Sequence, residues 1–138
     1  MIILDTNVIS ALMSKSPDMA VISWLDNQPR VSVWITSITI LEVRFGLQIL
    51  PASKKRNQLY QAFEKLLEQI DHRVAPFDLA AAQLAGDLMA ARKNKGRPGN
   101  LRDTMIAGIV LAHRATLATR NTWHFRDISA AVINPWIS

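Results

Sequence analysis

The start of the chain constrains the fold most, because a run of branched apolar residues ends there at an aspartate. Residues 2–4 read Ile-Ile-Leu, and such a run is typical of a strand buried on both faces of a parallel sheet. Asp5 follows, at the end of the strand where open α/β sheets carry their functional crevice. Its carboxylate is therefore placed for chemistry or for capping the next helix. We expect Thr6 and Asn7 to satisfy that helix's first N–H groups and leave the Asp5 oxygens available.

Strand-like and helix-like segments alternate along the rest of the chain. Further strands are expected at residues 31–35, 73–77, 115–119 and 131–133. Helices are expected at residues 8–14, from 18 towards Pro29, from 37 to 49, after Ser53, from 79 to 94 and from 101 to 113. This order predicts a three-layer α/β/α domain with a central, mainly parallel sheet of four to five strands. The length of 138 residues suits one domain spanning 1–138.

Two local patterns belong to the helix expected after the second strand. Thr39 and Glu42 have the spacing of a capping box, in which both side chains bond to the first turn of a helix. Four apolar residues then form one stripe at helical spacing, namely Ile38, Leu41, Phe45 and Ile49. Near the third strand, Pro76 indicates a strand end or a sheet edge.

Composition excludes several classes of site. The chain has no cysteine, so thiolate metal sites, disulfides and cysteine nucleophiles are impossible. Its net charge of +5 and pI near 10.1 favour a polyanionic partner such as nucleic acid, although a solvated basic surface would give the same values. No basic leader precedes the first apolar residues, and the longest uncharged apolar run, residues 105–112, is too short to cross a bilayer. We therefore expect a cytoplasmic protein without membrane contact.

Three acidic residues, Asp5, Glu42 and Asp103, lie among apolar ones, near strand ends or in the first turns of helices. Carboxylates brought together repel one another unless a cation or a proton is bound. An all-oxygen set favours Mg²⁺ or Mn²⁺ over Zn²⁺, and the three histidines lack ligand spacing. Taken singly, Glu42 is equally well explained as a capping partner and Asp103 as a charge at a helix N-terminus.

With these residues placed, the chain resembles the PIN-domain family, and within it the VapC-type toxin ribonucleases and their FitB-like relatives. The resemblance covers almost the whole chain and rests on Leu4-Asp5-Thr6-Asn7, Thr36-Ser37, Leu41-Glu42, Gly46, Arg102-Asp103, Ile106-Ala107, Ala118-Thr119-Arg120-Asn121 and Asn134-Pro135-Trp136. It implies that Asp5, Glu42 and Asp103 bind divalent metal. Several members of the family carry a fourth acid where this chain has Asn121, and Asp127 is a nearby carboxylate that could replace it.

The resemblance also implies an activity and partners. The chain would be the toxin of a type II toxin-antitoxin system, a Mg²⁺-dependent endoribonuclease with Mn²⁺ as a possible substitute. It would form a homodimer held inactive by a cognate VapB/FitA-like DNA-binding antitoxin. Flanking residues that could bind substrate phosphate, water or metal are Arg97, Arg102, Arg120, Ser37 and Thr119, each of which also has an ordinary structural explanation. The early helices carry further apolar residues that belong either to the core or to a partner surface, namely Val21, Trp24, Leu25, Leu41 and Phe45.

Two other classes remain open at this point. Residues 5–8, Asp-Thr-Asn-Val, weakly resemble the nucleophile motif of haloacid-dehalogenase-type phosphatases, in which Asp5 would form an aspartyl-phosphate. That interpretation gives Glu42 no role. The second alternative is a non-catalytic module that binds nucleic acid or an antitoxin and keeps only the fold.

Overall fold

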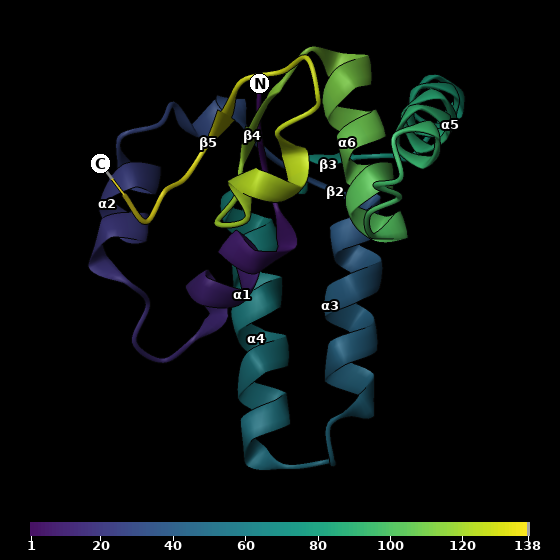
Figure 1. The fold of residues 1–138 in the computed structure, drawn as a ribbon. Helices are drawn as coiled ribbons and strands as arrows, with labels where there is room; N and C mark the ends of the chain where they lie inside the picture. The colour runs from purple at the N-terminus through teal and green to yellow at the C-terminus, as the bar shows by residue number, and fades with distance from the viewer. Residues whose placement is uncertain (138) are drawn as a thin grey trace.

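The computed structural model describes residues 1–137, and these form a five-stranded sheet in the order β3-β2-β1-β4-β5 (Figure 1). All four strand pairs are parallel. The strands are β1 (Ile2–Leu4), β2 (Val33–Thr36), β3 (Val74–Ala75), β4 (Thr116–Ala118) and β5 (Val132–Ile133). The predicted parallel α/β/α architecture is therefore confirmed.

β1 occupies the middle of the sheet, where neighbours on both sides bury its apolar residues. Ile3 and Leu4 are 0% and 1% exposed. Leu4 pairs with Ala118 of β4, and the backbone N–H of Asp5 donates to the carbonyl of Ala118 at 2.9 Å. The chain therefore leaves the sheet at the centre of its carboxyl edge. β3, which precedes Pro76, lies at the edge as expected.

Six α-helices surround the sheet: α1 (Thr6–Met13), α2 (Met19–Asp26), α3 (Ser37–Ile49), α4 (Lys54–Gln69), α5 (Leu79–Asn94) and α6 (Leu101–His113). Because successive strand residues point to opposite faces, Leu4 packs in one core cluster and Ile3 in the other. The first cluster is built mainly with α1 to α4, and the second mainly with α5 and α6. None of the helices in residues 1–137 is long and apolar enough to span a membrane.

Close packing of α5 against α6 brings two distant parts of the chain together. A Cβ added to Gly108 of α6 would lie 2.4 Å from the carbonyl oxygen of Ala81, so the two helices approach as closely as a glycine permits. This contact places the C-terminal half of α5 beside the start of α6, which carries Asp103.

Several boundaries differ from the prediction by one or two residues, and two of these differences have a clear cause. α1 begins at Thr6 rather than at residue 8, because Asp5 itself caps the helix. β2 begins at Val33 rather than Val31, because Arg30–Ser32 form a short 3-10 helix, η1, in which Val31 is 74% exposed.

The capping box expected at Thr39 and Glu42 of α3 is wrong. Thr36 caps the helix by accepting from the backbone N–H of Thr39, so Thr39 and Glu42 do not form a capping box. The buried residues of α3 are Ile38, Thr39, Val43 and Leu47. Leu41, Phe45 and Ile49 are instead 52%, 56% and 66% exposed, because the helix turns its other face to the core.

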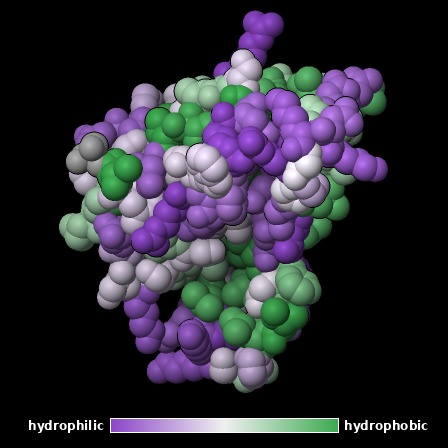
Figure 2. All heavy atoms as spheres, in the orientation of Figure 1, coloured by the Kyte–Doolittle hydropathy of each residue, from purple (hydrophilic) through white to green (hydrophobic). Residues whose placement is uncertain are grey.

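The apolar residues of α2 follow the first of the two explanations given for them, a place in the core. Val21 is fully buried, and Trp24 and Leu25 pack against the same core cluster. They are therefore core residues, and among the candidates for a partner surface only Leu41 and Phe45 stay exposed. Figure 2 shows hydrophobic side chains gathered over the lower part of the molecule, where α3 lies in Figure 1.

Candidate active site

Asp5 is 4% exposed, and within residues 1–137 it receives hydrogen bonds only from neutral groups. The backbone N–H of Thr6 donates to Oδ1 at 2.8 Å, and the hydroxyl of Thr119 donates to Oδ2 at 2.8 Å. The side-chain amide of Asn7 lies 3.4 Å from Oδ2. Asp5 therefore caps α1, as one of its two interpretations expects, while its role in chemistry at the carboxyl edge stays a prediction. The expectation that Thr6 and Asn7 would do the capping instead is wrong.

Thr119 and Asn7 hold the Asp5 carboxylate in place through one another. The Asn7 amide donates to Thr119 Oγ1 at 3.1 Å, and Asn7 Oδ1 accepts from the backbone N–H of Arg120 at 3.1 Å. The backbone N–H of Asn121 also donates to Thr119 Oγ1, at 3.1 Å. Because Thr119 Oγ1 accepts two hydrogen bonds, its own proton is directed to Asp5.

The pKa of Asp5 is raised from 3.8 to about 6. Burial is the largest cause, because it removes water from the charged form. The hydrogen bonds from Thr119 and Thr6 oppose the rise, while the negative charges of Asp103 and Glu42 add to it. The three predicted carboxylates therefore lie close enough to interact.

Unlike Asp5, the other two carboxylates each have a basic neighbour. Glu42 accepts from the hydroxyl of Thr6 at 2.8 Å, and its Oε2 lies 3.6 Å from Arg102 Nε. Asp103 Oδ2 lies 3.2 Å from Nδ1 of His124. The role of His124 beside Asp103 was missed, because a sequence separation of 21 residues resembles no ligand spacing.

The donor set fits a hard divalent cation. It consists of carboxylate oxygens, and Asp5 bears a raised pKa that a nearby positive charge would lower. Within residues 1–137, however, no three His, Asp or Glu side chains already stand as a ready set of metal ligands. Asp5, Glu42 and Asp103 thus lie in one neighbourhood without forming such a set.

The remaining predicted site residues divide into two groups. Arg102 and Thr119 touch the carboxylates, as described above, and Arg97 lines a cleft that also reaches Asp103. Ser37 and Arg120 have structural contacts: the Ser37 hydroxyl accepts from the backbone N–H of Phe77 at 3.0 Å, and the guanidinium of Arg120 lies 5.0 Å from the ring centre of Trp136. The side chain of Asn121 is exposed beside Thr119.

Asp127, the other candidate for the fourth acid, is bound to Arg92. Arg92 Nε and Nη2 donate to the two carboxylate oxygens, each at 2.8 Å, and these bonds lower the pKa of Asp127. Arg92 also donates to the Thr104 hydroxyl at 2.9 Å and to the carbonyl of His124 at 3.0 Å. This buried arginine ties α5 to the segments that carry Asp103 and His124.

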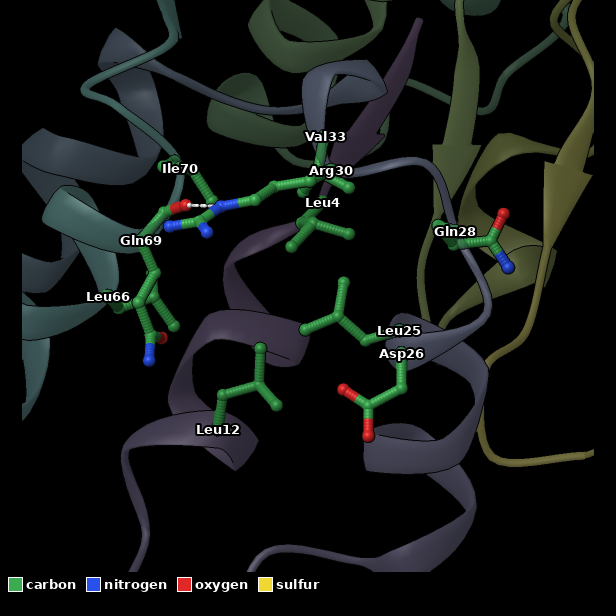
Figure 3. A pocket seen from close by; sticks show the side chains of 10 residues that line it. All are labelled: Leu4, Leu12, Leu25, Asp26, Gln28, Arg30, Val33, Leu66, Gln69 and Ile70. Carbon is green, nitrogen blue, oxygen red and sulfur yellow. Dashed lines mark hydrogen bonds between the residues drawn. The ribbon is translucent and has the colours of Figure 1, made fainter.

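A hollow of about 320 Å³ lies apart from these residues, between α1, α2 and α4 (Figure 3). Its walls are mostly apolar, and Leu4, Leu12 and Leu25 are among them. Arg30 donates to the carbonyl of Gln69 at 2.8 Å at its rim. None of the predicted site residues lines it.

Comparison with known proteins identifies the family of this chain. The model of the PIN domain matches residues 2–130. The chain belongs to the PIN-domain family. Over 137 residues this PIN domain is 42% identical to the VapC ribonuclease Y4jK of Sinorhizobium fredii, covering 99% of this chain and 98% of that protein. It is 36% identical to toxin FitB of Neisseria gonorrhoeae, covering 99% of each.

Solved structures agree with the fold. The crystal structure of FitAcB from Neisseria gonorrhoeae aligns with a TM-score of 0.90 and 35% identity over 100% of both chains. VapBC2 from Rickettsia felis, bound to a DNA fragment from its promoter, aligns with a TM-score of 0.79 and 26% identity over 97% of this PIN domain and 98% of that chain.

Proposed function

We propose that this PIN domain is the toxin of a type II toxin-antitoxin system and acts as a Mg²⁺-dependent endoribonuclease. The observation that carries the proposal is the buried Asp5 carboxylate, which lacks a cationic partner while the charges of Asp103 and Glu42 act on it. The family and the relatives named VapC ribonuclease and toxin FitB support this function.

Asp5, Glu42 and Asp103 would hold the metal, and Mn²⁺ would substitute for Mg²⁺. When bound, such an ion supplies water activation and charge stabilisation for phosphodiester hydrolysis. Thr119 and Asn7 keep the Asp5 carboxylate oriented. Arg102, whose side chain is 45% exposed beside Glu42, is placed to bind a substrate phosphate.

The two alternative functions fit the site less well. An aspartyl-phosphate mechanism gives Glu42 no role, although Glu42 is joined to the start of α1 through the Thr6 hydroxyl. A module that only binds nucleic acid has no need of a buried carboxylate whose ionisation is unfavourable. Metal-dependent cleavage separates the endoribonuclease from both alternatives.

The test is RNA cleavage by Asp5→Asn. We expect a fall of about 10²–10³-fold or more, because an essential charge at the reacting phosphate is removed. Asp87→Asn, an exposed aspartate of α5, is the matched control and should cleave like the wild type. Wild-type cleavage that survives EDTA, or cleavage by Asp5→Asn at the wild-type rate, would reject the mechanism.

We further propose a homodimer inhibited by a VapB/FitA-like DNA-binding antitoxin. The exposed apolar stripe of α3, made by Leu41, Phe45 and Ile49, supports a protein interface there. An apolar segment of the antitoxin with a basic tip would suit the apolar surfaces and the carboxylates.

The oligomeric state can be tested at the stripe itself. Phe45→Asp should convert the dimer to a monomer in size-exclusion chromatography with light scattering, because the charge would be buried in the interface. Val31→Asp, at another exposed apolar residue, is the control and should leave the dimer intact. A wild-type monomer that stays active beside the product of the neighbouring small reading frame would contradict both parts of this proposal.

A further inference from the structure

A cleft of about 330 Å³ opens beside Asp103. One wall is the loop before α6, including Arg97 and Asn100, and the other is the segment that carries Trp123, His124 and Arg126. Asp103, one of the three predicted carboxylates, lines this cleft and connects it to the candidate metal site. Its volume lies at the lower end of small-ligand sites, which span roughly 300–1,000 Å³.

Trp123 is the unusual residue of the cleft, since its large apolar side chain is 69% exposed. The guanidinium of Arg126 lies over the indole ring, 3.9 Å from its centroid, and Arg126 Nη1 donates to the carbonyl of Trp123 at 2.8 Å. These contacts stack a planar cation on an aromatic ring and hold both in place. The result is a flat, rigid surface at the mouth of the cleft.

The charges of the cleft favour an anion near this surface. The negative charge of Asp127 is neutralised by Arg92, which lies beneath it. The exposed arginines Arg97 and Arg126 therefore dominate the outer part, and Asp103 lies at the inner end. A ligand with a planar ring and a phosphate matches this arrangement, because rings stack on indole and guanidinium groups and arginine binds phosphate.

We propose that Trp123 and Arg126 form a nucleotide subsite that stacks one unpaired base of single-stranded RNA next to the cleaved phosphate, while Arg97 binds a neighbouring phosphate. This inference rests on the proposed endoribonuclease function. A base in a duplex is already stacked on its neighbours and cannot stack on Trp123 as well, so only an unpaired base fits this subsite.

The experiment measures binding of a fluorescein-labelled 12-nucleotide RNA to the Asp5→Asn protein, which is used to prevent cleavage, with Mg²⁺ present. Adding Trp123→Ala should weaken binding of the single strand about tenfold, whereas Trp123→Phe should keep most of the affinity because a phenyl ring still stacks. Val31→Ala, which truncates another exposed apolar side chain, is the control and should have no effect. The same RNA annealed to its complement should bind weakly to all four proteins.

A second pair of variants tests the phosphate contact. Arg97→Ala should weaken binding and reduce its dependence on salt, because one phosphate contact is lost. Lys54→Ala, at the start of α4 and not among the residues that line the cleft, removes the same charge without that loss.

The outcomes separate this inference from the proposed function. If wild-type protein cleaves RNA but Trp123→Ala binds the single strand as tightly as its parent, the subsite is wrong and the endoribonuclease stands. If Trp123→Ala instead loses binding to the antitoxin alone, the surface is a protein contact and the subsite is again wrong. A wild type that neither binds nor cleaves RNA would overturn both.

Discussion

Asp5 and Asp127 are two carboxylates near the same site, and they differ in what surrounds them. Asp5 is buried among neutral donors, and its pKa is raised to about 6. Asp127 receives two charged hydrogen bonds from Arg92, and its pKa is lowered. The first carboxylate is costly to ionise in the free protein, whereas the second is ionised at little cost.

This difference distinguishes a binding group from a structural one. A carboxylate whose oxygens are both bonded to an arginine has little to gain from a metal ion, because displacing the arginine would leave a buried positive charge. A buried carboxylate without a cation gains both charge compensation and ligands when an ion arrives. We therefore infer that Asp5 belongs to the metal site and that Asp127, proposed from the sequence as a fourth ligand, holds the scaffold.

The largest expected effect is the contrast in cleavage between the two kinds of carboxylate. Glu42→Gln and Asp103→Asn should each lower RNA cleavage by about 10²–10³-fold or more, since each removes a charge from the metal site. Asp127→Asn should cleave RNA within about tenfold of the wild-type rate under conditions in which the variant is folded, because Asp127 acts only through Arg92. If folded Asp127→Asn lost as much RNA cleavage as the other two variants, Asp127 would be a metal ligand.

The next largest effect is on folding stability and concerns the ion pair between Arg92 and Asp127. Arg92→Met should lower the free energy of unfolding by about 2–3 kcal/mol, because Thr104, Asp127 and the carbonyl of His124 all lose a donor. The expected loss is below the roughly 3–5 kcal/mol of fully buried pairs, since the Asp127 side chain is 33% exposed. Urea unfolding of the metal-free protein measures it.

The pH dependence of this pair has a definite sign. Because the pKa of Asp127 is lowered in the folded protein, the contribution of the pair to folding stability is present above the ordinary pKa of 3.8 and is lost as pH falls further.

The control for Arg92→Met is Arg44→Met, at an exposed residue of α3, which should change the free energy of unfolding by no more than about 0.5 kcal/mol. A similar loss in both variants would mean that the pair is not a structural link.

The fold could be predicted because its signals are local. An apolar run identified β1, β-branched residues identified β2 approximately, and Ser53 and Asp78 cap α4 and α5 as expected. At α3 two threonines competed for the capping position, and spacing alone selected Thr39 although Thr36 occupies it.

The site could be predicted only in part, because the residues that support its carboxylates, such as Arg92 and Asp127, are far apart in the sequence. Asp5, Glu42 and Asp103 are unusual acids within apolar sequence, which made them visible. Arg92 is followed by Lys93 near a helix end and therefore resembles a solvated basic residue. Only the packing of α5 on α6 buries it, 35 residues from its partner Asp127. No sequence pattern at Arg92 indicates this contact.

A smaller effect on folding stability is expected from the raised pKa of Asp5. In an acid whose pKa is raised on folding, the folded state binds protons more tightly, so stability falls as pH rises from about 4 to about 6 and stays lower above that. The rise from 3.8 to about 6 corresponds to a cost of about 3 kcal/mol at neutral pH. Asn keeps a capping oxygen but loses about 1 kcal/mol of hydrogen bonding.

Asp5→Asn should therefore be about 1–2 kcal/mol more stable than the wild type at pH 7.5 without metal. The advantage should disappear at pH 4 and shrink on addition of Mg²⁺, which stabilises only the wild type. Asp87→Asn provides the exposed control. A destabilised Asp5→Asn protein at pH 7.5 would show that capping outweighs the cost of the buried charge.

The smallest expected effect is on metal affinity and tests whether Asn121 occupies the fourth position of the metal site. Asn121 follows Thr119 by two residues, and its backbone N–H donates to the hydroxyl that orients Asp5, so a carboxylate there would lie near the other acids. Asn121→Asp should tighten Mn²⁺ binding about fivefold, or about 1 kcal/mol, because the added charge is exposed and screened by water. Asn57→Asp, an exposed residue of α4, makes the same change elsewhere and should leave the affinity unaltered. Calorimetric titration of both variants compares them directly. Unchanged or weaker binding by Asn121→Asp alone would place this residue outside the metal's reach, and the site would then depend on three carboxylates.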